Sequence, residues 1–584
     1  MVQFLDALDQ KHKAVDEVEI STFLSSEIEA LKKNGAAKIP TDLEAANIAF
    51  LVSERHDPDS HPWNTYFQPM ASVTAADGTP AYVPDVPKMP TTIFDEWVNA
   101  ADTRTHPIIR ARFSDLVWDF WHFFREEKRN VKYAHQAIDA YIAATSIEIS
   151  DEYQAWIYIE RALELAKTMK NSEQQNAAKN AAFLLHDRSA SLTNYMWWKL
   201  YDIFWLRRDI LTEVEIQKIV FSLNVTLDHL TNSDGEKFDP VRSLDAAERL
   251  ATCHRDMGKN ADSIRVILQA GNALEEKSKQ ADGLLATAWL ELIFNKYQKH
   301  KLHHETERVA LLLRDRGKDA IAGMKKVSSQ IEISQEEMDE LKAFYLTDDF
   351  VRTVEKIVLA HIQEDRSIQQ SADEQAKVAP LSAIISKRIF NSEGHLSAVI
   401  PSIQDDRDAY LMYFRGQNFA IDGLFLQFAF DWCVEKHAPV ADDWISLCVT
   451  GSLIHERHES FIRDGFIAWI SRDWIKTMFI MIPVVEAVLR DIYTEIGGNP
   501  LKPRKNSGRF DVISMGQILS SEIFKERFRP DIRLHLKALY TDARGMNLRN
   551  ELAHGLLHYS RINQRTANLV IHTMLMLASL RSPE

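Results

Sequence analysis

The chain has 584 residues, of which 45% are hydrophobic and 26% are charged, and its formal net charge is −15. This length predicts two to four domains, and the balance of residue types excludes a disordered or low-complexity protein. The acidic charge excludes broad, non-specific adhesion to nucleic acid or anionic membrane, unless a local patch reverses the sign.

The cysteines and the apolar stretches indicate the cellular compartment in which the protein is expected. Only Cys253, Cys433 and Cys448 are present, and such a sparse, odd set is typical of a reducing compartment rather than of a disulfide framework or a zinc cluster. The N-terminus lacks a basic region followed by an apolar run, and the most apolar stretches are too short to span a bilayer. We therefore expect a cytoplasmic protein with no membrane partner.

The first 91 residues predict an N-terminal helical segment and a proline-rich arm. Residues 1–50 have a helical pattern, whereas residues 56–90 contain seven of the chain's 18 prolines and predict an irregular, extended segment. This arm carries four side chains of the metal-ligand type, His56, Asp57, Asp59 and His61. Because prolines break the loop and no second cluster completes a site, we expect no metal there.

The segment 92–365 predicts helices, because apolar residues recur at intervals of three and four. Small residues occupy positions where paired helices would cross, as in AIDAYIAA at 137–144, and strand patterns are nearly absent. These features predict an all-α fold in which an irregular α-solenoid of tetratricopeptide-like helical hairpins precedes a C-terminal bundle. No strict period is present.

The segment 366–445 predicts a linker and connecting helices, because residues 363–380 are polar and almost free of aromatic side chains. Further on, His455 and His458 resemble part of a zinc-binding helix motif. They are three residues apart rather than four and no third ligand is evident, so we interpret them as solvated helix surface. The charged sequence HHETE at 303–307 has the same interpretation.

The segment 446–584 predicts a bundle of four or five antiparallel helices. A long helix is expected at 472–498, with a kink or restart at Pro483 and an end at Gly497 and Gly498. A basic loop follows, and then come shorter helices. One of them contains the sequence NLRNELAHGLLH at 547–558.

That sequence places polar side chains on a leucine-rich helix of about three turns. At about 100° per residue, Asn550 and His554 lie one turn apart on one face, and His558 continues the stripe. Arg549 lies about 140° from His554, so one helix does not easily bring both to a single phosphate. Two copies related by a two-fold axis would do so, which predicts a homodimer through this bundle.

The hexapeptide RNELAH at 549–554 resembles the signature of the HEPN superfamily, an arginine, a polar residue, three residues and a histidine. Members are small helical bundles, and many are metal-independent endoribonucleases that act as dimers. The longer stretches at 546–556, 482–498 and 110–120 resemble a poorly characterised bacterial family with a domain of unknown function. Bacterial relatives of this architecture commonly resemble regulated stress or antiviral defence effectors, in which a large helical region restrains a toxic nuclease.

A second arginine and histidine, Arg529 and His535, have a permissible spacing for this signature, but a proline occupies the polar position. The HEPN-like motif has Asn550 at that position. It is also accompanied by Glu486 and Arg490, one turn apart on the preceding long helix. This conjunction favours residues 549–554 as the site.

The resemblance implies that RNA is cleaved by attack of a 2′-hydroxyl on the neighbouring phosphate, with no metal and no cofactor. His554 would exchange protons, and Arg549 would stabilise the charge on the phosphorane oxygens. Asn550 would orient the histidine or donate to a phosphate oxygen. Glu486 would pair with Arg490 or Arg549 across the bundle.

A local reversal of charge surrounds this motif. Residues 502–549 contain 11 Lys or Arg against 5 Asp or Glu, a net charge of +6 in an otherwise acidic chain. Such a patch attracts phosphate, which predicts a set of RNA-binding residues, Lys502, Arg504, Lys505, Arg509 and Arg490. The alternative is a solvated face that docks onto the acidic N-terminal region.

Two other functions are compatible with the sequence. One is a non-catalytic α-helical scaffold or interaction protein, with an inert HEPN-like domain and a protein trigger or partner bound on the helical region. The other is nucleotide binding without cleavage. Product analysis after incubation with RNA separates these functions from the nuclease.

Overall fold

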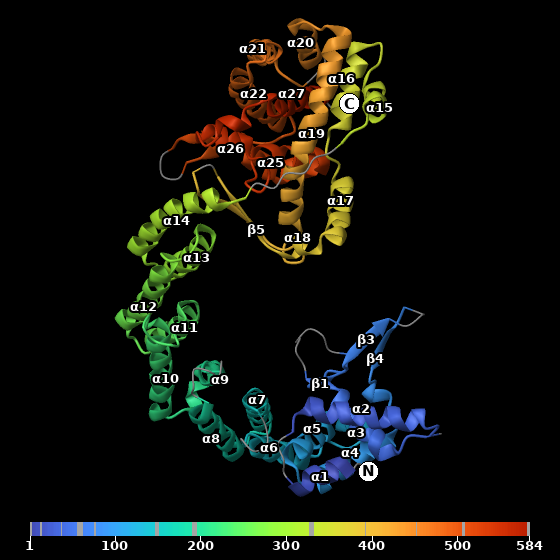
Figure 1. Ribbon diagram of the computed structural model, residues 1–584, viewed down its shortest axis with the longest axis vertical. Helices are drawn as coiled ribbons and strands as arrows, with labels where there is room; N and C mark the ends of the chain where they lie inside the picture. Colours follow the sequence, from blue (N-terminus) through green and yellow to red (C-terminus); the bar gives the residue numbers. More distant parts are fainter. Residues whose placement is uncertain are drawn as a thin grey trace. The chain divides into compact units, whose positions relative to one another are not determined.

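The computed structural model describes residues 3–11, 15–36, 38–54, 62–74, 78–146, 151–189, 196–325, 332–391, 393–450, 453–504 and 508–580. These residues contain 27 α-helices and only short strands, which confirms the all-α prediction (Figure 1). Contacts divide the chain into two compact units, residues 1–274 and 275–584. Within the described ranges, no helix combines the length and the apolar character that crossing a membrane requires.

The first unit begins with three helices, α1 (Gln3–Lys11), α2 (Glu17–Lys33) and α3 (Thr41–Leu51). The proline-rich arm then forms two short antiparallel hairpins, β1 (Ser53–Glu54) with β2 (Phe67–Gln68) and β3 (Ala71–Thr74) with β4 (Pro80–Val83). The described part of the arm is extended, but it forms paired strands rather than the irregular segment that was predicted. The four residues of metal-ligand type, His56, Asp57, Asp59 and His61, lie outside the described residues.

Helices that are consecutive in the chain pack against one another in the rest of the first unit, which confirms the solenoid-like arrangement. For example, α4 packs on α5, α5 on α6, α6 on α7, and α10 on α11. Most of α5 is buried, because α3, α4 and α6 pack against it. The elements are η1 (Val86–Lys88), α4 (Thr91–Thr103), α5 (Pro107–Phe124), α6 (Val131–Ala144), α7 (Glu152–Thr168), α8 (Ser172–Ser189), α9 (Lys199–Phe204), η2 (Trp205–Ile210), α10 (Glu213–Thr231), α11 (Pro240–Asp256) and α12 (Asn260–Ser278).

The second unit continues with a helical pair and then builds a large core. The elements before the predicted bundle are α13 (Gly283–Lys299), α14 (His303–Gly323), α15 (Gln335–Tyr345), α16 (Phe350–Ala360), α17 (Asp365–Val378), α18 (Pro380–Ile384), β5 (Lys387–Phe390), β6 (Leu396–Ile400) and α19 (Arg407–His437). The prediction of a linker at 363–380 is wrong, because most of it forms α17. Ile368 and Ala372, one turn apart, are buried there. Its polar composition belongs to the exposed side of an amphipathic helix.

The predicted bundle consists of α20 (Ala441–Val449), η3 (Glu456–His458), α21 (Glu459–Ile470), α22 (Trp474–Glu495), β7 (Leu501–Pro503), β8 (Phe510–Val512), α23 (Met515–Ser520), α24 (Glu522–Arg527), α25 (Pro530–Tyr540), α26 (Leu548–Ala553), η4 (Tyr559–Arg561) and α27 (Gln564–Ala578). The helix α22 runs through Pro483 without interruption, and Gly497 follows its end with a φ of 93°.

The compact units do not follow the four predicted segments. The boundary between residues 274 and 275 lies inside the predicted solenoid, and the core of the bundle begins before residue 446. Both α16 and α19 pack on α27, because each buries its apolar face in the core that α27 also lines. A long-range hydrogen bond joins α21 and α27 in this core. The indole N–H of Trp469 donates to the buried Asn568 Oδ1 (2.8 Å), 99 residues further along the chain.

Three buried histidines lie in the core of the second unit. The ring centroid of His572 lies 5.7 Å from that of His535 and 6.1 Å from that of His361. Burial lowers the pKa of His361 to about 3 and that of His572 to about 4, and it holds the pKa of His535 well below its usual value. All three imidazoles are therefore neutral in the folded protein at neutral pH.

We expect these histidines to destabilise the folded protein as the pH falls. The unfolded chain binds a proton at each histidine below about pH 6.5, whereas the folded chain does not until the pH is much lower. Each histidine therefore removes about 1.4 kcal/mol of the free energy of unfolding per pH unit across this window. In urea titrations between pH 6 and pH 5, His535→Phe should lower the pH slope of the unfolding free energy by about this amount. Parallel slopes for the two proteins would contradict the prediction.

Candidate active site

The HEPN-like motif lies on α26, which is shorter than predicted. The helix ends at Ala553, because Gly555 adopts a left-handed conformation (φ 70°) that stops it. The backbone N–H of His554 still donates to the carbonyl of Asn550 (3.0 Å), so His554 lies one turn beyond Asn550 as predicted. The prediction that His558 continues the stripe is wrong, since His558 follows the turn and caps η4.

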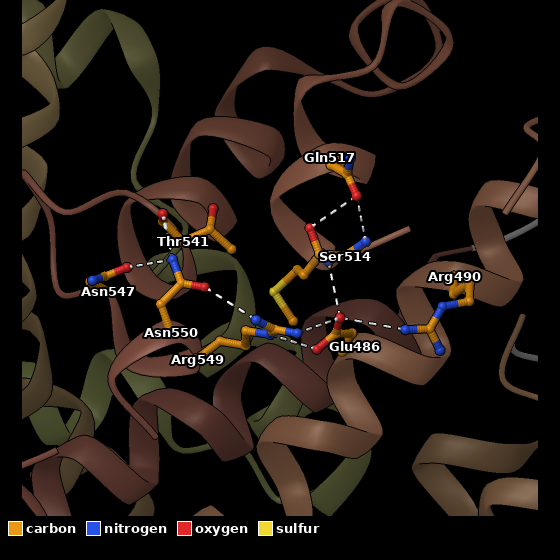
Figure 2. Close-up of polar contacts among 9 residues, drawn as sticks. Glu486, Arg490, Ser514, Gln517, Thr541, Asn547, Arg549 and Asn550 are labelled. Atoms are coloured by element: carbon orange, nitrogen blue, oxygen red, sulfur yellow. Dashed lines mark hydrogen bonds and ion pairs between the residues drawn. The ribbon is translucent and has the colours of Figure 1, made fainter. Parts of the chain in front are cut away.

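The carboxylate of Glu486 is the hydrogen-bond acceptor that both arginines of the site share (Figure 2). It comes from α22 and accepts two hydrogen bonds from Arg549, with Nε to Oε2 at 2.7 Å and Nη2 to Oε1 at 3.1 Å. Oε1 also accepts from Arg490 Nη2 (3.4 Å) and from the backbone N–H of Met515 (3.0 Å). The predicted pairing of Glu486 is confirmed, and it involves both arginines at once.

This arrangement leaves an excess of positive charge. Two guanidinium groups surround one carboxylate, and the side chain of Glu486 is 12% exposed whereas those of Arg549 and Arg490 are 24% and 28% exposed. The Nε of Arg490 is buried without a hydrogen-bond partner among the described residues. The arginines are therefore more accessible to solvent than Glu486, an arrangement that favours the binding of an anion.

Asn550 is engaged inside the bundle. Its amide nitrogen donates to the carbonyl of Thr541 (3.0 Å) and to Asn547 Oδ1 (2.9 Å), and its amide oxygen accepts from Arg549 Nη1 (3.3 Å). Both donor hydrogens of the amide are used. Neither is left to orient His554 or to bind a phosphate, which were the roles predicted from the sequence. The contacts instead make Asn550 a positioning residue for Arg549 (Figure 2).

His554 stands apart from this network. It is exposed, and its imidazole makes no hydrogen bond or ion pair with any described residue. The structure thus joins Arg549, Asn550, Glu486 and Arg490 in one cluster but does not bring His554 into it. A proton-transfer role for His554 would depend on groups that a ligand or a second copy of the chain supplies.

Two supporting contacts were not predicted from the sequence. Met515 begins α23 and binds Glu486 only through its backbone N–H, which no residue pattern reveals. Glu551, inside the motif, pairs with Arg561, whose Nη2 also donates to the carbonyl of Met546 (2.8 Å). These contacts of Arg561 link η4 to α26 and to the residues that precede it. A carboxylate three residues before the motif histidine was the only signal of this contact in the sequence.

The predicted basic loop is an antiparallel hairpin of β7 and β8. Leu501 pairs with Val512 and Pro503 with Phe510, so these side chains share one face, and Phe510 is 64% exposed. Lys502 lies on the other face. Past the paired strands, the N–H of Arg504 donates to the carbonyl of Arg509 (2.8 Å), while Lys505 lies outside the described residues.

Two of the histidines considered as alternatives, His458 and His535, are buried, whereas His455 is exposed, as expected. His458 is buried and its Nε2 lies 2.7 Å from Asp491 Oδ2, so its interpretation as solvated helix surface was wrong. His535, the histidine of the second possible motif, belongs to the core. In the described part of the chain, no three His, Cys, Asp or Glu side chains form a group suited to a metal ion.

Comparison with known protein families gives a match in the first unit. Residues 48–178, in the first unit, match the family described as a domain of unknown function, DUF7380. The matched stretch includes the sequence at 110–120. No curated protein matches the chain, and no solved structure does.

Proposed function

We propose that the protein is a metal-independent endoribonuclease whose site is built on Arg549 and His554 and is completed by a second copy of the chain. The observation that carries this proposal is the pair of partly exposed guanidinium groups around Glu486, together with the exposed His554, which follows Arg549 by five residues and has no partner among the described residues. We further propose that it works in the cytoplasm as a regulated stress or antiviral defence effector, an expectation that rests on the HEPN resemblance.

The proposed reaction forms a bond between the 2′-oxygen and phosphorus and breaks the bond between phosphorus and the 5′-oxygen. The products are a 2′,3′-cyclic phosphate and a 5′-hydroxyl. In each composite site, His554 of one copy accepts the proton of the 2′-hydroxyl, and water donates a proton to the leaving 5′-oxygen. Arg549 stabilises the charge on the phosphorane, and Glu486 keeps its guanidinium in place.

The hairpin of β7 and β8 supplies a path for RNA to this site. Its chain continues directly from β8 to Met515, whose N–H contacts Glu486. Lys502, Arg504, Lys505 and Arg509 provide the positive charge that attracts phosphate, and the exposed ring of Phe510 provides a surface on which a base stacks. DNA is not a substrate for this reaction, because it lacks the 2′-hydroxyl.

Replacing His554 by Ala tests the proposed reaction. We expect cleavage of total RNA in EDTA to fall by at least ~10²-fold, because the variant loses the proton-transfer group. Stability should be unchanged, since the imidazole is exposed. His558→Ala is the matched control, because this exposed histidine lies four residues away and bonds to Ser560. Full activity of His554→Ala, or activity that EDTA alone abolishes, would contradict the proposal. Absence of cleavage by the unaltered protein would favour the inert scaffold.

Reversing the charges of the hairpin tests the RNA path. With Lys502, Arg504, Lys505 and Arg509 changed to Glu, RNA should bind more weakly. The log–log salt slope should fall by ~0.7 for each phosphate that the variant no longer neutralises. The control variant changes Lys32 and Lys33, which are exposed on α2, to Glu. An unchanged slope in the hairpin variant would mean that this segment does not touch RNA.

Mixing two inactive chains tests the composite site. Arg549→Ala and His554→Ala proteins should each be inactive, and their mixture should regain partial cleavage, because a heterodimer contains one site with both groups. The measurement is RNA cleavage after the two chains are exchanged at micromolar concentration. A monomer by light scattering that cleaves with full specific activity would instead place the complete site within one chain.

A further inference from the structure

The first unit contains a cavity that the proposed nuclease does not use. It has a volume of about 650 Å³ and lies between β1, the residue before β2, α7, and the segment formed by α9 and η2. This volume falls in the range of ligand pockets. Glu54, Tyr66 and Arg161 line it, and all three belong to the stretch 48–178.

The charged groups of its wall are nearly all paired. Arg161 is bound to the fully buried Asp115 by two hydrogen bonds of 2.8 Å and to Glu164 by a third of 3.0 Å. Lys199 donates to Glu160 (2.5 Å). Asp202, another carboxylate of the wall, accepts two hydrogen bonds of 2.9 Å from Arg249. Of the cations in the wall, only the exposed Arg207 has no carboxylate partner among the described residues.

Glu54 is the exception among the carboxylates. It is half-buried, and its carboxylate has no hydrogen bond or ion pair with any described residue. The nearby Arg112 donates instead to the carbonyl of Ala49 (2.8 Å) and pairs with Glu17 (3.3 Å). Burial, with repulsion from Glu17, raises the pKa of Glu54 to about 7. The charges that face it are those of Glu17 on α2, Arg112 and Asp115 on α5, and Arg161 on α7.

Tyr66 adds a second polar group without a partner. One side of its ring is covered by the guanidinium of Arg161 (3.5 Å to the ring centroid), while its hydroxyl makes no hydrogen bond within the described residues. An acceptor pair of this kind, one carboxylate and one phenol oxygen, suits a group with several N–H donors. An anion would meet four carboxylates in the wall, those of Glu54, Glu160, Glu164 and Asp202.

The exposed rim of the cavity combines charged side chains, those of Glu160, Glu164, Asp202 and Arg207, with two large apolar ones. Tyr153 is 59% exposed and Leu206 is 91% exposed. A free small cation that fills the cavity would leave these side chains in water. A protein segment that inserts one basic side chain would also cover them, and large exposed apolar side chains around a polar pocket are typical of such contacts.

We propose that this cavity receives an arginine or lysine side chain of a partner protein, held by Glu54 and Tyr66 and flanked by Tyr153 and Leu206. The proposal is independent of the nuclease, because every residue that carries it lies in the first unit. A bound cation favours the ionised form of Glu54. Binding therefore releases a proton, and affinity rises from pH 6 to pH 8.

The test is calorimetric titration of the full chain with two peptides, acetyl-Leu-Arg-Leu-amide and the same peptide with neutral citrulline in place of arginine. We expect the arginine peptide to bind at least ~10-fold more tightly and to release protons at pH 7, seen as a dependence of the heat on the buffer. Glu54→Gln should remove the preference, and Tyr66→Phe should weaken it by several-fold. Glu173→Gln, at an exposed position on α8, is the control.

Each outcome bears on the proposal. Equal affinity for the two peptides, or a preference that survives in Glu54→Gln, overturns it. Free agmatine that binds as tightly as the arginine peptide overturns the assignment to a protein segment, because the rim would then contribute nothing. Loss of peptide affinity in Leu206→Ser, with agmatine binding unchanged, supports it.

Discussion

The ion pairs of Glu486 are the interaction on which the candidate site depends. The carboxylate is nearly buried, yet it holds two guanidinium groups and one backbone N–H from three different helices. Without it, Arg549 and Arg490 would repel each other, and α22, α23 and α26 would lack a common polar partner. Removing one partner from a buried ion cluster is costly, because the remaining charges lose their compensation. The geometry of the site is thus inseparable from the stability of the bundle.

Local features of the sequence predicted the parts of this site that lie close together in the chain. Glu486 and Arg490 are four residues apart on a helix, so their contact follows from helical geometry. The pairing of Glu486 with Arg549 spans 63 residues and was only one of two options that the sequence allowed. The contact of Met515 uses a backbone group, which carries no signature. The end of α26 had a signal, the glycine at 555, that the leucine repeat obscured.

In the fold, too, local features could be predicted from the sequence and long-range packing could not. Apolar spacing predicted helices in both units, because each helix buries one side against its neighbour. Composition alone misplaced the linker at 363–380, where two buried residues of α17 suffice to anchor a polar helix. The domain boundaries could not be predicted either, since they depend on which distant helices share a core. Only tertiary packing decides that α16 and α19 join α27.

The hydrogen bond between Trp469 and Asn568 has a consequence for synthesis of the protein. Its partners are 99 residues apart, and α22, which carries Glu486, packs on α27 in the same core. A growing chain that has already produced Glu486 therefore cannot complete the core until α27 has left the ribosome. If the site cleaves RNA, this order of assembly keeps a nascent chain from attacking its own ribosome and the message that encodes it.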